Sequence, residues 1–260
     1  MKIFLATVTI VLIGLAVSVA KPAQDDALGK PFTKWTKSDA EKILNDSPWA
    51  RSQTVRIRGE SKMRRVAGAP VDMSSGTPTI PSTALGGAEA PIDFTFLLRL
   101  RSSLCIREAL VRLKQIESGY DKLNPEKQAQ FDAQPKIRGL LTCPACEQNY
   151  VLTLTAKSSE APGADAVFNV FKGGRLADLQ RYVFIANSRG VRRYLIHFVP
   201  PNAPGEEAVF YFQRFDADGV PLLTPDDTEL IANFTNNEVN MNTNFKIDVR
   251  SLIVNGLLDF

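Results

Sequence analysis

The spacing of hydrophobic residues changes along this chain, and each spacing predicts a different kind of element. Residues 3–17 form an unbroken apolar run, which is typical of an export or membrane-spanning segment. Between residues 104 and 133, apolar side chains recur every three or four positions, which predicts amphipathic helices. From Val167 onward, short alternating runs predict β-strands. The pattern therefore indicates helices followed by a strand-rich C-terminal half.

A first helix is expected near the start of the chain after the apolar run. Ser38 and Glu41 have the spacing of a capping box, in which the serine oxygen and the glutamate satisfy free backbone amides. The helix should run to about Asn45 and end before Pro48, because a proline disfavours helical geometry in the residue ahead of it.

Two further helices are expected to form a hairpin. Ser102 or Ser103 can cap the first of them. Its predicted buried stripe is Ile106, Ala109, Leu110, Leu113 and Ile116, and its predicted water-facing residues are Arg107, Glu108, Arg112, Lys114 and Glu117. The other begins at Asn124, which precedes a proline at the first helical position, and ends before Pro135.

Strands are predicted on both sides of these helices. Val55–Arg58 and Phe94–Arg101 precede the helices, and the later strands are Tyr182–Asn187, Val191–Val199, Ala208–Phe215, Thr228–Phe234 and Phe245–Val249. The pair Asn255-Gly256 should close a final hairpin between Leu252–Val254 and Leu257–Phe260. Short connections join antiparallel neighbours, so we expect an antiparallel β-meander that closes into a sandwich or an open barrel.

The predicted fold class is α+β. Val209–Phe212 is apolar on both faces, so this strand should be central and covered by the helical hairpin. Residues 67–93 hold four Pro and four Gly but no Lys or Arg, and such a segment buries too little surface to offset the entropy of ordering it. We therefore expect a single domain over residues 21–260 with a flexible loop at 67–93.

Residues 1–20 have the layout of a cleavable signal peptide. Lys2 precedes the apolar run, and the small residues Ser18-Val19-Ala20 form a cleavage site. The alternative is an uncleaved anchor, which the polar residues after Ala20 disfavour. We expect an exported protein, periplasmic or extracellular, with no transmembrane segment once the peptide is removed.

The charge balance argues against nucleic-acid binding. The 260 residues carry 31 Lys and Arg against 28 Asp and Glu, a net charge of +3. A nucleic-acid-binding protein of this size is usually strongly basic on one face. The local excess of arginine between Arg51 and Arg65 is interpreted as a strand edge protected by charge.

The three cysteines are the most chemically suggestive residues. An oxidising compartment favours one structural disulfide. Cys143 and Cys146 could pair with each other, closing a small loop worth about 2 kcal/mol, or either could pair with Cys105, closing a loop worth about 4 kcal/mol. Proximity favours the short bridge and energetics the long one, so the pairing stays open.

A Cys-x-x-Cys pair also occurs in thiol-disulfide catalysts, in zinc sites and at covalently attached haem. Thiol-disulfide catalysis usually places the first cysteine at the start of a helix, but here the alternating residues Tyr150–Leu154 predict a strand soon after the pair. A zinc site would need Cys105, Cys143, Cys146 and the only histidine, His197. Glu147 stands where covalent haem attachment needs a histidine. We expect no cofactor.

No catalytic constellation is evident, so the function expected is that of a non-catalytic binding or envelope-associated module. Its partner would be a protein or a small apolar ligand, and the candidate pocket residues are Phe198, Phe210, Phe212 and Phe234. The alternative is a thiol-disulfide or metal-binding role for Cys143 and Cys146.

Three stretches resemble a group of exported bacterial proteins of unknown function. They are Lys34-Trp35-Thr36 through Ile43-Leu44-Asn45-Asp46-Ser47-Pro48-Trp49-Ala50, then Cys143-Pro144-Ala145-Cys146 with Asn149-Tyr150, and Phe212-Gln213-Arg214-Phe215-Asp216. The resemblance implies export and carries no activity.

Overall fold

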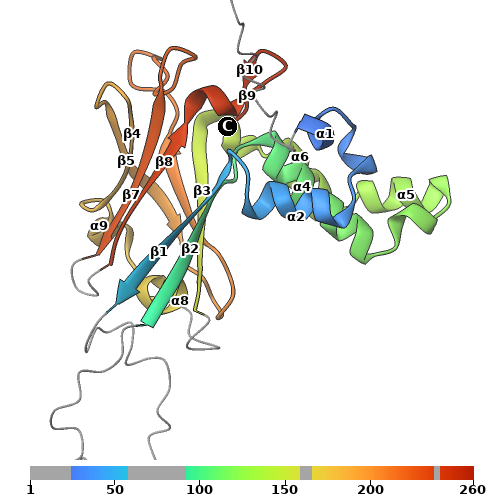
Figure 1. Cartoon of the computed structure of the whole chain (residues 1–260), viewed down its shortest axis with the longest axis horizontal. Coiled ribbons are helices and arrows are strands. Elements are labelled where there is room, and N and C mark those ends of the chain that lie inside the picture. The colour runs from blue at the N-terminus through green and yellow to red at the C-terminus, as the bar shows by residue number, and fades with distance from the viewer. Residues whose placement is uncertain (1–24, 58–91, 159–165, 237–240) are drawn as a thin grey trace, which may run out of the picture.

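The computed structural model describes residues 25–57, 92–158, 166–236 and 241–260 (Figure 1). The expected signal peptide lies outside these ranges, as do residues 67–91 of the expected loop. Residues 92 and 93 belong to a strand.

Eight antiparallel strands form a nearly closed, barrel-like sheet, so the α+β class with an antiparallel sheet is confirmed (Figure 1). In spatial order the strands run β1-β2-β3-β6-β5-β4-β7-β8. Their bounds are β1 Ala50–Ile57, β2 Ile92–Leu100, β3 Asn149–Lys157, β4 Val183–Asn187, β5 Arg192–Val199, β6 Ala208–Gln213, β7 Glu229–Asn236 and β8 Met241–Asp248.

The C-terminal half is not the simple meander that the turns predicted. Strands β4, β5 and β6 do follow one another, but β6 then pairs with β3, and β7 pairs with β4. The chain therefore crosses from one side of this three-stranded unit to the other between β6 and β7. Turn residues indicate that neighbouring strands are antiparallel, but they carry no information on which non-local strand completes each edge.

The two ends of the sheet meet through a side chain. The Asn244 amide in β8 donates a hydrogen bond of 3.1 Å to Gln53 Oε1 in β1, and no backbone ladder joins these two strands in the described ranges. Alternation along each strand then directs one set of side chains inward. Phe96, Phe210 and Phe234 are fully buried there, and rings of Phe171, Phe198 and Phe210 contact one another.

Helices α1, α2, α4, α5 and α6 lie beside the upper ends of β1, β2 and β3 in Figure 1. Helix α4 packs against α2 and α6, and the short α8 contacts β3 and β6 near the opposite end of the barrel. The helical bounds are α1 Asp25–Leu28, η1 Phe32–Lys34, α2 Lys37–Asn45, α4 Leu104–Glu117, η3 Tyr120–Lys122, α5 Pro125–Asp132, α6 Pro135–Thr142, α7 Pro144–Gln148, α8 Ala166–Phe171, α9 Leu176–Leu179 and η5 Val249–Leu252. Within the described part of the chain, none of these helices has the length and apolar content needed to cross a membrane.

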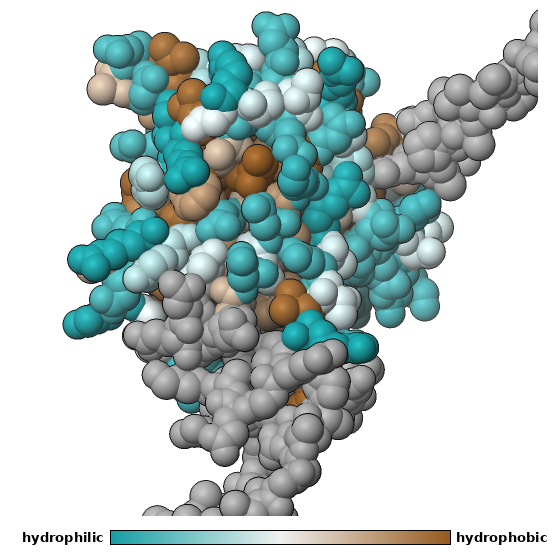
Figure 2. All heavy atoms as spheres, turned by 60° about the vertical axis from the view of Figure 1, so that its left-hand side comes forward, coloured by the Kyte–Doolittle hydropathy of each residue, from teal (hydrophilic) through white to brown (hydrophobic). Residues whose placement is uncertain are grey.

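The expected helical cover of β6 is only partly right. Phe210 and Phe212 point into the barrel, whereas Val209 and Tyr211 face outward and stay half-exposed beside Leu140 and Ala145 of the α6–α7 region. Figure 2 shows further apolar side chains on the outer surface of the β4–β5 side, where Tyr194 is about half exposed. Apolar residues on both faces of a strand therefore do not imply burial on both faces.

Two local details of the helices correct the sequence analysis. The capping box of α2 uses Thr36 and Asp39, two residues before the expected pair. In α4, Ser103 is the cap, and the buried stripe is rotated so that Arg112 is 5 % exposed instead of facing water. The Arg112 guanidinium donates to Trp35 O and pairs with Asp121. A polar residue can join a buried face when tertiary partners satisfy it, which helical spacing alone does not reveal.

The predicted C-terminal hairpin is confirmed. Strands β9 Ile253–Val254 and β10 Leu257–Leu258 pair across Asn255 and Gly256. Both turn residues have positive φ, 51° and 80°, which is the geometry that favours Asn-Gly in a two-residue hairpin.

We expect Phe210→Ala to lower the free energy of unfolding by about 3 to 5 kcal/mol, because it removes a ring that contacts Phe171, Phe198 and Phe234 in a fully buried position. Urea unfolding measures the change. The control is Gln213→Ala at the exposed end of the same strand, which should stay within about 0.5 kcal/mol. Equal effects of the two substitutions would contradict the packed interior.

Candidate functional site

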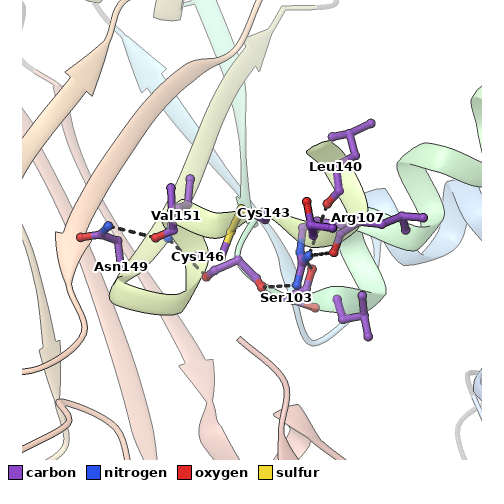
Figure 3. Close-up of a disulfide and its surroundings, with 12 residues drawn as sticks. Ser103, Arg107, Leu140, Cys143, Cys146, Asn149 and Val151 are labelled. Carbon is purple, nitrogen blue, oxygen red and sulfur yellow. Dashed lines mark hydrogen bonds between the residues drawn. A yellow bond between two sulfur atoms is a disulfide. The ribbon is translucent and has the colours of Figure 1, made fainter. Parts of the chain in front are cut away.

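The Cys143–Cys146 pair lies at a sharp corner between two helices and forms a disulfide (Figure 3). Helix α6 ends at Thr142, α7 begins at Pro144, and Cys143 between them has a left-handed φ of 35°. Cys105 remains a buried free thiol. The structure therefore contains the short bridge of the two alternatives that the sequence left open.

The helices on both sides of this corner were not expected from the sequence. We expected the pair to run directly toward a strand, but the five-residue helix α7 lies between Cys143 and β3. The available signals were Pro135 and Pro144, each at the first position of a short helix. In the sequence analysis, the expected absence of a helix after Cys143 argued against thiol-disulfide catalysis. This argument no longer holds, because α7 begins directly after Cys143.

The two cysteines differ in exposure, and an arginine from α4 braces the corner. Cys143 is half-exposed, whereas Cys146 is 5 % exposed. The Arg107 guanidinium donates to the carbonyl oxygens of Leu140 and Leu141 at the end of α6. It also donates to Ser103 O at the start of α4 (Figure 3). Burial lowers the pKa of Arg107.

A second arginine holds the other side of the corner. Arg214 Nη2 donates to Cys146 O at 2.9 Å and to Phe260 O at 2.6 Å. Its guanidinium also stacks against the rings of Tyr150 and Phe260. Burial lowers the pKa of Arg214, and its Nε is buried without a hydrogen-bond partner among the described residues.

Asp259 anchors the C-terminal segment on the start of α4. Its carboxylate accepts hydrogen bonds from the amides of Leu104 and Cys105, at 2.6 and 3.1 Å, and from Ser103 Oγ at 2.6 Å. The Asp259 carbonyl oxygen accepts a bond from Trp49 Nε1. A carboxylate at a helix N-terminus is favourable because the first amides lack partners within the helix.

A groove of about 510 Å³ lies against this same helix start. Its walls come from the N-terminal segment, α4 and the β9–β10 hairpin. The lining residues are Leu28, Lys30, Pro31, Phe32, Trp35, Leu104, Cys105, Glu108, Val254, Asn255, Leu257, Leu258 and Asp259. Most of these are apolar, and Leu104 and Leu257 are exposed.

Glu108 is the perturbed acid of the groove. We expected this residue to face water, but it is half-buried, and burial together with the nearby Asp259 carboxylate raises its pKa to about 6. No hydrogen bond or ion pair of its carboxylate is found within the described ranges. Burial raises the pKa of the Cys105 thiol, and the nearby Asp259 carboxylate raises it further. The thiol therefore stays protonated.

A larger hollow of about 690 Å³ lies on the outer surface of β1, β2 and β3. Two of its charged groups, Arg99 and Glu207, are already paired with each other, and Arg101 also bonds the Glu207 carboxylate. One side ends at Ser158, where the described segment stops. We therefore do not assign it a ligand.

The remaining candidate residues are not brought into one site. Phe198, Phe210, Phe212 and Phe234 belong to the packed core, so their role as a ligand pocket stays a prediction. His197 is exposed on β5 and stacks near Tyr211. Within the described residues, no group of His, Cys, Asp or Glu is arranged to hold a metal ion, and the proposed zinc set does not assemble there.

Comparisons of the chain with protein-family models, with curated proteins and with solved structures give no match.

We expect Asp259→Asn to lower the free energy of unfolding by about 1 to 2 kcal/mol, because the amide is a weaker acceptor for the amides at the start of α4. Thermal and urea unfolding measure this loss. Asp226→Asn is the matched control, because Asp226 is exposed in a turn and should tolerate the change. If the two variants have the same free energy of unfolding, the Asp259 cap does not stabilise the protein.

Proposed function

We propose that this protein is a binding module that takes a small molecule with an apolar body and a cationic group into the groove beside α4. The observation that carries the proposal is the half-buried carboxylate of Glu108, which lines the groove without a polar partner in the described structure. A concave, mostly apolar site with one perturbed ionisable group is the usual form of a small-molecule site.

The apolar walls support a ligand with a hydrocarbon body. Phe32 and Trp35 from one segment face Leu104 of α4 and Leu258 of the hairpin around one groove. Leu257 is 74 % exposed, which leaves an apolar side chain at the rim that a ligand could cover. Covering such surface is favourable by about 25 cal/mol for each Å² removed from water.

The charges around the groove support a cationic group. The Asp259 carboxylate is already occupied by helix donors, and Arg107 donates to the backbone carbonyls of Ser103 and Leu140. Lys30 is exposed at the groove. Burial and Asp259 raise the pKa of Glu108 more than Arg107 lowers it. An ammonium group would therefore stabilise the charged form of Glu108, while a ligand carboxylate would oppose it.

The barrel interior is a less favourable location for a ligand. A molecule there would have to displace rings that already contact one another at centroid distances of 4.9 to 5.3 Å. The groove needs no such rearrangement. The sequence also predicted an apolar ligand, but among the phenylalanines of the barrel. We propose the groove beside α4 as its binding site instead.

We expect octylammonium to bind the purified protein at least tenfold more tightly than octanol, and octanoate to bind more weakly than either. The reason is a charge-assisted contact with Glu108, which is typically worth about 1.5 to 3 kcal/mol. Isothermal titration calorimetry at pH 7.5 measures the three affinities. Glu108→Gln should remove the preference for the amine, whereas Glu117→Gln, an exposed change in the last turn of the same helix, should retain it. Equal binding of amine and carboxylate would overturn the proposal.

We also expect Glu108→Gln to stabilise the protein above pH 6. The pKa of Glu108 is raised from 4.5 to about 6, so the folded state holds this proton more tightly than the unfolded chain. The wild-type protein therefore loses stability as the pH rises from 4.5 through 6, and an uncharged glutamine avoids that loss. Urea unfolding at pH 5 and pH 8 measures the difference. A gain that is equal at both pH values would contradict the raised pKa.

A further inference from the structure

We propose that the Cys143–Cys146 bridge is redox-active and exchanges with a pair of cysteines on another protein, with Cys143 Sγ as the sulfur that is attacked. This activity is separate from ligand binding in the groove and goes beyond it. It depends on three features of the corner: the exposure of the two cysteines, the pocket beside them, and the supports that hold the corner in place.

The exposure of the two cysteines sets the direction of attack. Cys143 is partly exposed and lines a surface pocket, whereas Cys146 is buried, so a partner's thiolate would approach the bridge from the side of Cys143. Thiol-disulfide exchange requires access to one sulfur and departure of the other as a thiolate. The arrangement therefore distinguishes an attacked sulfur from a leaving sulfur.

A small pocket beside Cys143 offers a place for the partner. Its volume is about 200 Å³, and Cys143 lines it together with Arg101 and Arg107. The apolar part of its lining includes Val151 and Tyr211. Arg107 donates to backbone carbonyls, and Arg101 is paired with Glu207. The apolar part of the lining fits a cysteine-bearing segment with apolar neighbours.

The bridge contributes little to holding the corner in shape, because other bonds already hold it. In the chain-entropy model, a disulfide that closes so short a loop stabilises the protein less than one that closes a long loop. Arg107 holds the end of α6, Arg214 holds Cys146 O, and the Cys146 amide donates to Cys143 O. The corner can therefore keep its shape when the sulfur–sulfur bond opens.

Arg214 is placed to favour the leaving thiolate. Its guanidinium is bonded to the Cys146 carbonyl, and its buried Nε–H has no acceptor among the described residues. A cation beside a cysteine stabilises the thiolate relative to the thiol. The guanidinium, held at the Cys146 carbonyl, thus brings a positive charge to the residue on which the leaving thiolate forms.

The exchange balances without a cofactor. A partner thiolate attacks Cys143 Sγ, a bond between these two sulfurs forms, and the Cys143–Cys146 bond breaks with its electron pair on Cys146 Sγ. The partner's second thiolate then attacks the partner sulfur of the mixed disulfide and releases Cys143. The partner dithiol is oxidised by two electrons, the bridge here is reduced, and both new thiolates take protons from water.

The first test uses the unaltered protein in glutathione buffers of graded ratio, with alkylation and mass measurement as the readout and circular dichroism as the check on folding. We expect the bridge to open and re-form reversibly while the protein stays folded. A bridge that opens only when the protein unfolds would overturn the proposal.

The second test compares Cys146→Ser with Cys143→Ser. We expect Cys143 in the first variant to form a mixed disulfide with oxidised glutathione at least tenfold faster than Cys146 in the second. The buried Cys105 is present in both variants and serves as the internal control. Equal rates for the two cysteines would contradict Cys143 as the attacked sulfur.

Discussion

The carboxylate of Asp259 at the start of α4 is the contact on which the arrangement of this protein depends. The first amides of a helix have no hydrogen-bond partners within it. Asp259 satisfies two of them and Ser103 Oγ, while its own backbone oxygen takes the Trp49 indole. One residue near the C-terminus thus joins the C-terminal hairpin, α4 and the start of β1.

Arginines extend this network to both sides of α4. Arg112 ties the helix to Trp35 O in the N-terminal segment, and Arg107 ties it to the end of α6. Arg214 joins the disulfide corner to Phe260, the neighbour of Asp259. The groove and the disulfide therefore share one support, although they lie on different sides of the helix. Buried guanidinium groups suit this role because their several donors can satisfy carbonyl oxygens from separate segments.

The barrel contributes rigidity more than a binding cavity. Its inward positions are filled by aromatic rings, and the pockets described above lie outside it, where helices and the terminal hairpin meet the sheet. A packed interior gives the outer elements a fixed base. The groove and the disulfide corner depend on a few polar contacts outside the barrel. Each of these contacts can be altered without creating a cavity in the core.

Elements with strong local signals could be located from the amino-acid sequence alone. Alternation located β2 and β6, Asn255-Gly256 located the last hairpin, and Asn124 before Pro125 located α5. These features arise from side-chain periodicity and backbone preferences that act over a few residues. The Cys-x-x-Cys spacing drew attention to Cys143 and Cys146, but it did not show which cysteines form the disulfide or that α7 follows Cys143.

The strand order, the burial of Arg112 and the raised pKa of Glu108 in the groove result from tertiary packing. Pairing of β6 with β3, and of β4 with β7, joins segments separated by dozens of residues. The pKa of Glu108 is raised because packing of the groove buries this residue and because Asp259, 151 positions later, lies near it at the start of α4. Such contacts depend on the shape that remains after the whole chain has packed, so no local pattern in the sequence encodes them.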